Sequence, residues 1–152
     1  MNKSVYELAK RFKKKYFGTI AFRLKQHSKV IEDHLNKDEK LLYDFCGQKG
    51  HSNKEIFSSC VFALTDQRMI IATKRVVWGY FLTSVTPDLF NDLKIQSGIF
   101  FGKVFIDTAK ELITISNLAK GSLYELETAF STYISKGKEN KNEEKKTKKK
   151  SK

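Results

Sequence analysis

The sequence contains no apolar run long enough to cross a lipid bilayer, because its longest runs are only a few residues and a span needs roughly 20. It also lacks a secretory signal, since residues 1–35 mix charged and apolar side chains throughout. Only two cysteines occur, Cys46 and Cys60, which excludes a small disulfide-stapled fold and predicts buried thiols of a cytosolic protein. With 152 residues and 40% hydrophobic side chains, the chain is expected to form one folded domain.

Catalytic and metal-binding motifs are also lacking. His27 and His34 are seven residues apart on an expected helix, about 10 Å along its axis, too far for the paired histidines of a zinc helix. The cysteines do not form a C-x-x-C motif, and no glycine-rich loop is followed by the Lys and Ser or Thr that bind phosphate. We therefore expect no catalytic residues, no metal site and no cofactor, and interpret the protein as a non-enzymatic binding module.

Positive charge is in excess, and it lies at the two ends of the sequence. The chain has 29 Lys plus Arg against 17 Asp plus Glu, a net charge of +12. Residues 1–35 and residues 136–152 each carry a net charge of +6, whereas the residues between them are neutral overall. A polyanion or an anionic membrane is therefore expected to contact the flanking segments.

The C-terminal segment, residues 136–152, contains no aliphatic or aromatic residue and ends in KKTKKKSK. Because it has nothing to bury, we expect it to be disordered. A lysine tail of this kind attracts anionic lipid, at about 1 kcal/mol per charge, or nucleic acid through counterion release; a tail that only keeps the protein soluble is the simpler alternative. The candidate anion-binding residues are Lys145, Lys146, Lys148, Lys149 and Lys150.

The N-terminal segment has the pattern of amphipathic helices. Ser4 and Glu7 have the spacing of a capping box. Apolar residues then recur at helical spacing, at Val5, Leu8, Phe12 and Tyr16. The cations, which lie mostly across the other side, are Lys3, Lys10, Arg11, Lys13, Lys14 and Lys15. A second apolar stripe is rotated from the first, with Gly18 between them, so we expect two helices or one kinked helix.

This basic amphipathic segment has three interpretations. In the first, Phe12 and Tyr16 enter the headgroup layer of an anionic membrane, and Lys10, Arg11 and residues 13–15 contact lipid phosphates. In the second, the apolar stripe packs on the protein's own core. In the third, it packs on a second subunit, and the lysines of either packed helix only face solvent.

From Leu41 onward the apolar period changes to two, which indicates β-strands. Seven runs have strand length, at residues 41–46, 56–64, 68–73, 76–82, 92–96, 103–108 and 112–116. Their links are mostly short, so neighbouring strands are expected to be antiparallel and to form a meander that curls or closes. After them, a second capping box at Ser122 and Glu125 precedes a helical stripe that would cover an open end of the barrel: Leu123, Leu126, Phe130 and Ile134.

Several apolar residues of this middle segment admit more than one placement. We expect Trp78 and Tyr80 to lie in the core. Between two glycines, Ile99, Phe100 and Phe101 either continue a strand into the core, which we favour, or form an exposed hairpin tip that contacts a bilayer or a partner.

Residues 64–75, LTDQRMIIATKR, resemble the strand-turn-strand hallmark of bacterial pleckstrin-homology-like domains, a hydrophobic-Leu-Thr-x-x-Arg-hydrophobic pattern. For its arginine, Arg68, we expect a structural role such as bonding turn carbonyls or pairing with Asp66. Residues 88–118 are similar to the later strands of that family, and the best match is to its YokE-like group. The resemblance implies a mainly β fold with α-helices, a PH-like two-sheet antiparallel barrel or sandwich of about seven strands capped by a C-terminal helix, here preceded by amphipathic helices.

The resemblance also implies binding rather than catalysis, because pleckstrin-homology folds usually bind phosphoinositides, other membrane lipids or protein partners. The phosphoinositide pocket of that family has several Lys and Arg across the first hairpin. The corresponding segment here, residues 47–55, offers Lys49, His51 and Lys54 but no arginine, and Glu55 offsets one charge. Lys49 and Lys54 remain candidate anion-binding residues.

We therefore predict a helical segment over residues 1–35, a PH-like domain over 36–135 and a tail over 136–152. The favoured function is reversible association of the basic flanks with anionic membrane lipids or a protein partner. The alternatives are homo-oligomeric assembly through the N-terminal helices and non-specific nucleic-acid binding, which only charge supports. The expected location is the cytoplasm, with peripheral attachment at the inner face of the membrane in the lipid-binding interpretation.

Overall fold

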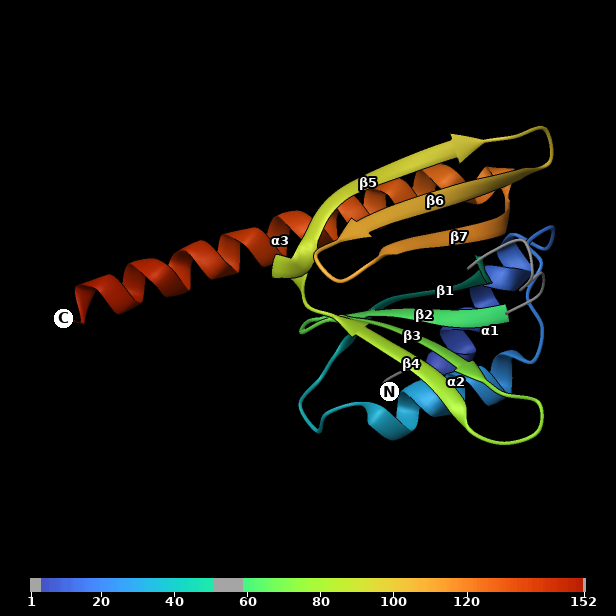
Figure 1. Cartoon of the computed structure of the whole chain (residues 1–152), viewed down its shortest axis with the longest axis horizontal. Coiled ribbons are helices and arrows are strands. Elements are labelled where there is room, and N and C mark those ends of the chain that lie inside the picture. The colour runs from blue at the N-terminus through green and yellow to red at the C-terminus, as the bar shows by residue number, and fades with distance from the viewer. Residues whose placement is uncertain (1–3, 51–58, 152) are drawn as a thin grey trace.

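The computed structural model describes residues 4–50 and 59–151. Two helices precede seven strands, and a long helix follows them (Figure 1). The helices and strands are α1 (Val5–Lys15), α2 (Leu24–His34), β1 (Leu41–Gly50), β2 (Ser59–Thr65), β3 (Met69–Lys74), β4 (Tyr80–Val85), β5 (Phe90–Ser97), β6 (Phe101–Thr108), β7 (Leu112–Ala119) and α3 (Leu123–Lys150), with short 3-10 turns at Pro87–Leu89 and Lys120–Ser122.

The strands form one curled antiparallel sheet in the order β4-β3-β2-β1-β7-β6-β5. Strand β1 joins the two halves, because it pairs with β2 from Leu41 to Gln48 and with β7 from Gln48 to Gly50. Since β1 and β7 pair only at that end, the sheet stays open and curves into a half-barrel (Figure 1). The predicted antiparallel meander and closing helix are confirmed, and β1 links the two predicted sheets into a continuous one.

Helices α1 and α2 cover the half of the sheet made by β1 to β4 (Figure 1). The predicted capping box starts α1: Ser4 Oγ accepts from the Glu7 amide, and Glu7 Oε2 accepts from the Ser4 amide, each at 3.2 Å. Helix α1 packs on β1, and α2 packs on β3. With core on both faces, every residue of β2 is buried, which explains its unbroken apolar run.

The apolar stripe of α1 belongs to this core. Phe12 is only 4% exposed, and its ring centroid lies 5.8 Å from that of Phe45. Phe45 in turn stacks on Phe62 at 4.5 Å and meets Phe130 of α3 edge-on. Phe12 is therefore not positioned to enter a membrane, and half-buried Tyr16, 5.1 Å from Phe12, belongs to the same aromatic cluster. Among the three interpretations of this stripe, the structure matches packing on the chain's own core.

Helix α3 closes the curl of the sheet and then leaves the domain. Its first half buries Leu123, Leu126, Phe130 and Tyr133. The predicted capping box at Ser122 does not form: Ser122 Oγ donates to the Ala119 carbonyl at 2.7 Å, and Glu125 bonds Lys15 and Tyr43 instead. Among the described residues, no helix is both long and apolar enough to span a membrane.

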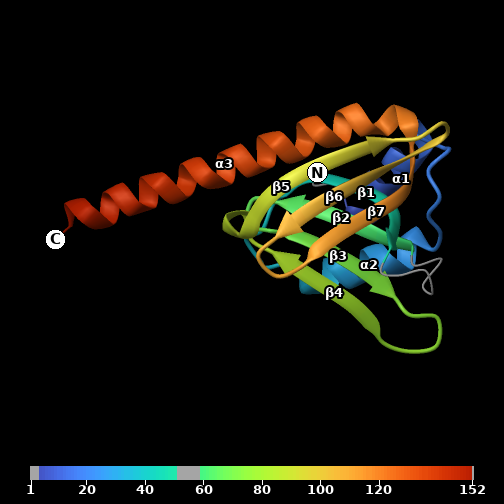
Figure 2. The ribbon, with the colours of Figure 1, turned by 45° about the horizontal axis from the view of Figure 1, so that its top comes forward.

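The C-terminal lysines differ from the expected disordered tail, because α3 continues through them to Lys150 (Figures 1 and 2). The segment is rich in Lys and Glu, which lose little side-chain freedom in a helix. It also begins as the continuation of a helix already nucleated on the core, so the cost of starting a helix does not apply. The composition of this segment predicts disorder, whereas the structure shows an exposed helix.

Candidate functional site

Three connecting segments lie at one end of the curled sheet, which we call the loop end. It consists of residues 16–23 between α1 and α2, residues 75–79 between β3 and β4, and residues 98–101 at the turn between β5 and β6. Hydrogen bonds tie residues 16–23 to the sheet: the Ile20 amide donates to the Asn117 carbonyl and the Phe22 amide to Ser59 Oγ, both at 2.9 Å. All three segments lie on the right-hand side of Figure 1.

Apolar side chains project from every segment of the loop end. Eight of the thirteen exposed large hydrophobic residues among the described residues lie here: Phe17, Phe22, Val76, Val77, Trp78, Ile99, Phe100 and Phe101. Monomeric proteins rarely expose large apolar surface in one region, and where they do it marks an interaction site. The loop end is therefore the strongest candidate binding surface of the domain.

Trp78 and the segment from Ile99 to Phe101 were expected in the core, and the structure corrects that expectation. The fourth strand begins at Tyr80, so the apolar run before it forms a hairpin turn with Gly79 at a φ of +80°. Trp78 is 75% exposed as a result, and Tyr80 is also exposed. The segment containing Ile99 and Phe100 is likewise an exposed tip, which was the less favoured of its two interpretations, and Phe101 is the first residue of β6.

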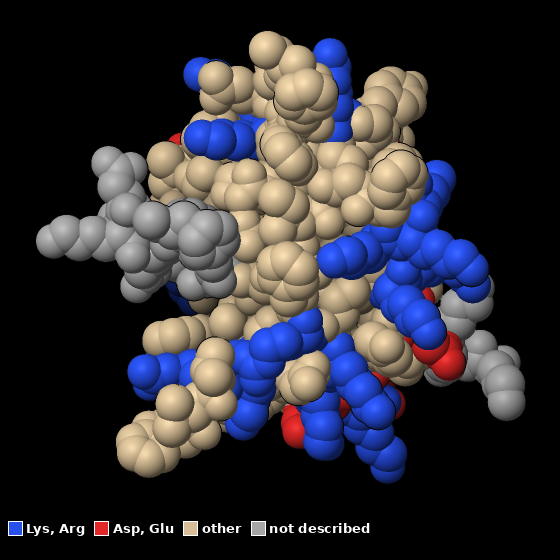
Figure 3. Space-filling model, turned by 90° about the vertical axis from the view of Figure 1, so that its right-hand side faces the viewer, with Lys and Arg blue, Asp and Glu red and all other residues tan. Residues whose placement is uncertain are grey.

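Cations surround the apolar tips. Figure 3 views the molecule onto the loop end and shows Lys and Arg side chains across its lower and right-hand parts, with few acidic side chains among them. The connection between α1 and α2 ends with Arg23, and the β3–β4 hairpin contributes Lys74 and Arg75. The last turn of α1 adds Lys13 and Lys14. Lys13 is anchored there, because its Nζ donates to the Ala21 carbonyl and lies 5.1 Å from the centre of the Phe22 ring.

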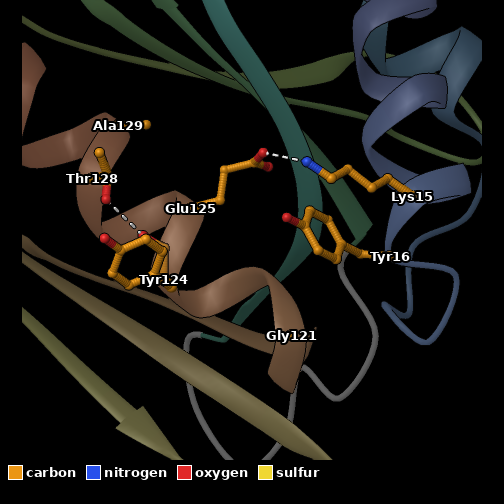
Figure 4. Close-up of a pocket in the computed structure, with 7 residues that line it drawn as sticks. All are labelled: Lys15, Tyr16, Gly121, Tyr124, Glu125, Thr128 and Ala129. Atoms are coloured by element: carbon orange, nitrogen blue, oxygen red, sulfur yellow. Dashed lines mark hydrogen bonds and ion pairs between the residues drawn. The ribbon is translucent and has the colours of Figure 1, made fainter.

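The predicted N-terminal lysines therefore divide into two groups. Lys15 forms an ion pair with Glu125 of α3 at 2.8 Å (Figure 4). Burial raises the pKa of Glu125, but the hydrogen bonds from Lys15 and Tyr43 outweigh burial and hold that pKa below its ordinary value. The pair lines a hollow of about 450 Å³ between α1 and α3 together with Tyr16 and Tyr124, and it fastens α1 to the closing helix. Lys10, over the ring of Tyr6, and Arg11 are exposed on α1.

The other predicted anion-binding residues do not join the loop end. The side chain of Lys49 is only 11% exposed, and its Nζ forms an ion pair with Glu111 Oε1 at 3.6 Å, so the charge of this lysine is neutralised within the fold. Lys54 and His51 lie outside the described residues. The lysines over residues 145–150 lie on the part of α3 that projects away from the loop end (Figure 2). The two basic flanks thus point in opposite directions.

Arg68 has the structural role that the hallmark predicts, but its acidic partner is Glu39 and not Asp66. Its Nε donates to Glu39 Oε1 at 2.9 Å, and its Nη2 donates to the His34 carbonyl at 2.8 Å. Asp66 instead accepts from the Lys40 amide at 2.9 Å. Arg68 therefore fastens the end of α2 and the segment before β1 to the turn between β2 and β3.

The buried polar side chains of the domain are structural as well. Cys46 and Cys60 are free and buried, as predicted. Burial raises the pKa of both thiols, that of Cys46 to about 12, so both stay protonated. His27 accepts from the Lys74 amide at 2.7 Å, and burial lowers its pKa to about 4, so it joins α2 to β3 as a neutral ring. Over residues 4–50 and 59–151, no group of three or more His, Cys, Asp or Glu could hold a metal ion.

Sequence reasoning named the tip from Ile99 to Phe101 only as its less favoured alternative, and it missed the other apolar residues of the loop end. The sequence pattern places Phe17 on the second helical stripe and gives Phe22 no role. Gly18 between them nevertheless marks the break between α1 and α2. Val76 and Val77 were assigned to a strand, although the Lys-Arg pair before them and Gly79 after them have the composition of a turn. The expected strand begins at residue 76 and the observed one at Tyr80, and this four-residue difference leaves Val76 and Val77 exposed in a turn.

Comparison with known proteins identifies the family of this chain. No curated protein matches the chain. The crystal structure of a pleckstrin homology domain from Shewanella amazonensis SB2B is similar to it, with a TM-score of 0.48 and 13% sequence identity over 70% of this chain and 94% of the other. The sequence model of the bacterial PH domain family matches residues 35–132, well over half of the chain. The chain therefore belongs to the bacterial PH domain family.

Proposed function

We propose that the protein binds reversibly to anionic membrane surfaces and that the loop end is the docking face. Domains of this family are generally binding modules rather than enzymes. The observation that carries the proposal is the gathering of exposed apolar side chains from three separate segments, among cations, at one end of the sheet (Figure 3). A flat anionic surface can contact all three segments together.

Two contributions of ordinary size support this kind of binding. Apolar side chains gain about 25 cal/mol for each Å² that leaves water, or about 1.5–3 kcal/mol for each large side chain that is fully buried. Each Lys or Arg close to an anionic leaflet adds about 1 kcal/mol. Neither contribution alone holds a protein firmly, whereas two together give stable but reversible attachment.

The proposal differs from attachment through both basic flanks. Lys13 and Lys14 of α1 stand beside the loop end, whereas the lysines over residues 145–150 project in the opposite direction (Figure 2). Phe12 is buried, so the apolar contribution comes from the tips at Phe22, Trp78 and Phe100 instead. The N-terminal flank thus contributes charge, and the connecting segments contribute the apolar contact.

Trp78 allows a direct test, because it is the only tryptophan of the chain and is exposed in the absence of lipid. We expect its fluorescence to shift to shorter wavelength and to become protected from iodide quenching when vesicles of phosphatidylcholine and phosphatidylglycerol are added. Vesicles of phosphatidylcholine alone should leave the spectrum unchanged. An equal response to both vesicles, or none to either, contradicts the proposal.

Matched variants test the docking face. Val77→Ser combined with Phe100→Ser shortens two tips and keeps the tryptophan, and it should weaken co-sedimentation with the anionic vesicles by about tenfold or more, equivalent to about 1.4 kcal/mol. Leu42→Ser combined with Leu112→Ser is the control, because both leucines are exposed on the far end of the sheet. If both double variants bind alike, the loop end is not the docking face.

A further inference from the structure

We propose that a groove between α2 and the β3–β4 hairpin binds the phosphate-bearing headgroup of an anionic lipid, an inference that rests on the membrane docking proposed above. The groove has a volume of about 650 Å³, within the range of sites that hold small molecules. It begins at the loop end, beside Arg23 and Arg75, and runs along α2 to His34.

The charge of the groove is strongly unbalanced. Five cations line it, namely Arg23, Lys25, Lys29, Lys74 and Arg75. Asp33 is the acidic residue of the lining, and Lys29 neutralises it at 3.0 Å. The other four cations form no ion pair within the described part of the chain. Guanidinium and ammonium groups gathered in this way are complementary to phosphate oxygens.

The apolar walls of the groove favour a lipid over a free anion. Buried Val30 contributes to one side, while Val76 and Val77 on the exposed hairpin tip line the opposite side. At the far end, His34 Nε2 lies 3.0 Å from the Tyr80 hydroxyl. A ligand whose phosphate meets the cations would therefore place its apolar part against the same hairpin that is proposed to enter the membrane.

Arg23 is held in place before any ligand arrives. Its φ of +56° is in the left-handed region, which non-glycine residues rarely adopt and which occurs preferentially at functional sites. Its Nη1 donates to the Lys74 carbonyl at 3.0 Å, so the guanidinium spans the gap between α2 and β3. A cation positioned in advance loses less conformational freedom on binding.

The groove also depends on a part of the chain that the family match does not include. Residues 35–132 supply Lys74, Arg75 and the hairpin, whereas Arg23 at the N-cap of α2 and Lys25 within α2 lie outside the matched range. Headgroup binding here is thus a property of the N-terminal helices combined with the domain.

Short-chain lipids below their micelle concentration test the groove without a membrane. In amide NMR spectra of the full chain, dihexanoyl phosphatidic acid should give saturable shifts over residues 23–34 and 74–80. Dihexanoyl phosphatidylcholine should bind at least about tenfold more weakly, because its choline cation opposes the groove charge. Inorganic phosphate should also bind more weakly than phosphatidic acid; equal affinity would show a free-anion site and overturn the lipid assignment.

Matched charge variants separate the groove from the docking face. Lys25→Gln with Arg75→Gln should weaken phosphatidic acid binding by about tenfold, at about 1.4 kcal/mol for the pair. Lys94→Gln with Lys103→Gln, on exposed positions of β5 and β6, removes the same charge and should leave the affinity unchanged. If the two double variants bind phosphatidic acid with equal affinity, the groove is not the headgroup site.

A backbone variant completes the test. Arg23→Gly removes the cation but adopts the same φ without strain, so weaker lipid binding with unchanged thermal stability would assign the effect to the guanidinium. Retained binding of phosphatidic acid by Arg23→Gly would count against a role for that residue in the groove. Failure of these soluble lipids with a normal Trp78 response to anionic vesicles overturns the groove alone, whereas the reverse pattern overturns the docking face alone.

Discussion

The two ends of the curled sheet use positive charge in different ways. At the end that holds the β2–β3 turn, Arg68 is bonded to Glu39, and the side chain of Glu39 is fully buried. At the loop end, Arg23 and Arg75 form no ion pair with any described carboxylate. A cation paired with a buried carboxylate holds elements of the fold together, whereas unpaired and exposed cations beside apolar tips stabilise little. The contrast supports a structural role for the charge at one end and agrees with the binding role proposed for the other.

Removing the paired arginine, Arg68, should have the largest effect, a loss in the free energy of unfolding. Arg68→Ala leaves the buried carboxylate of Glu39 without its cation and should lower the free energy of unfolding by about 3 kcal/mol. Urea unfolding at pH 7 measures this change. Arg75→Ala is the matched control and should alter stability by less than about 0.5 kcal/mol, because Arg75 is exposed. Similar losses in both variants would remove the contrast between the two ends.

A carboxylate between the two ends should give the next largest effect. Asp44 on β1 is buried, its two oxygens have no hydrogen-bond partner in the described structure, and burial, with a smaller contribution from Glu32, raises its pKa to about 8. The folded state then binds a proton that the unfolded chain releases above its ordinary pKa of 3.8, so the free energy of unfolding falls as pH rises from about 4 to about 8.

Asp44→Asn should remove this pH dependence. At pH 8 we expect the variant to be more stable than the unsubstituted protein by about 1–3 kcal/mol, and at pH 4 the two should be nearly equal. Thermal unfolding at several pH values measures the difference. A wild-type stability that is flat between those pH values would show that Asp44 is solvated or paired in solution.

Single cations at the loop end should have smaller effects on binding. Arg75→Gln should weaken binding to anionic vesicles by about fivefold, corresponding to about 1 kcal/mol. Lys37→Gln, on the exposed segment before β1 at the opposite end, should leave binding unchanged. Added salt should reduce the difference between the two variants, because screening weakens exposed charges. An identical loss in both would mean that only net charge matters.

The smallest effect is expected from the C-terminal lysines. Truncation after Asn142 keeps the contact between Lys141 and Asp88 at 3.6 Å and removes the lysines that follow. Since this part of α3 points away from the loop end (Figure 2), vesicle binding should change by less than about twofold, or about 0.4 kcal/mol. A tenfold loss would show that the tail and the loop end reach the same membrane.

Local patterns predicted most of the elements of the fold. The change from helical to alternating apolar spacing near Leu41 marks the start of β1, and the unbroken apolar run ending at Leu64 is a strand buried on both faces. The capping box at Ser4 formed as expected, because both of its partners lie within one helical turn. Patterns of this kind depend only on neighbours in the chain.

Local patterns failed where burial depends on distant contacts. Trp78 and Phe100 occur in apolar runs that resemble strands, yet the chain turns at both places and both side chains are exposed. Phe12 occurs on a basic amphipathic helix that resembles a membrane-binding one, yet Phe45 is its partner. The partner of Arg68 likewise lies in a segment far from the turn, at Glu39.

The amino-acid sequence by itself determined the elements, the family and the excess of positive charge, because these follow from composition and from spacing along the chain. Tertiary structure decided which charges are neutralised and which apolar side chains remain in water, since both depend on what the curled sheet brings within a few ångströms. It packed α1 against the sheet, turned α3 away from the loop end and set Arg23 beside Lys74. A candidate binding surface arose because the fold places exposed apolar side chains and unpaired cations of the described residues at that end of the sheet.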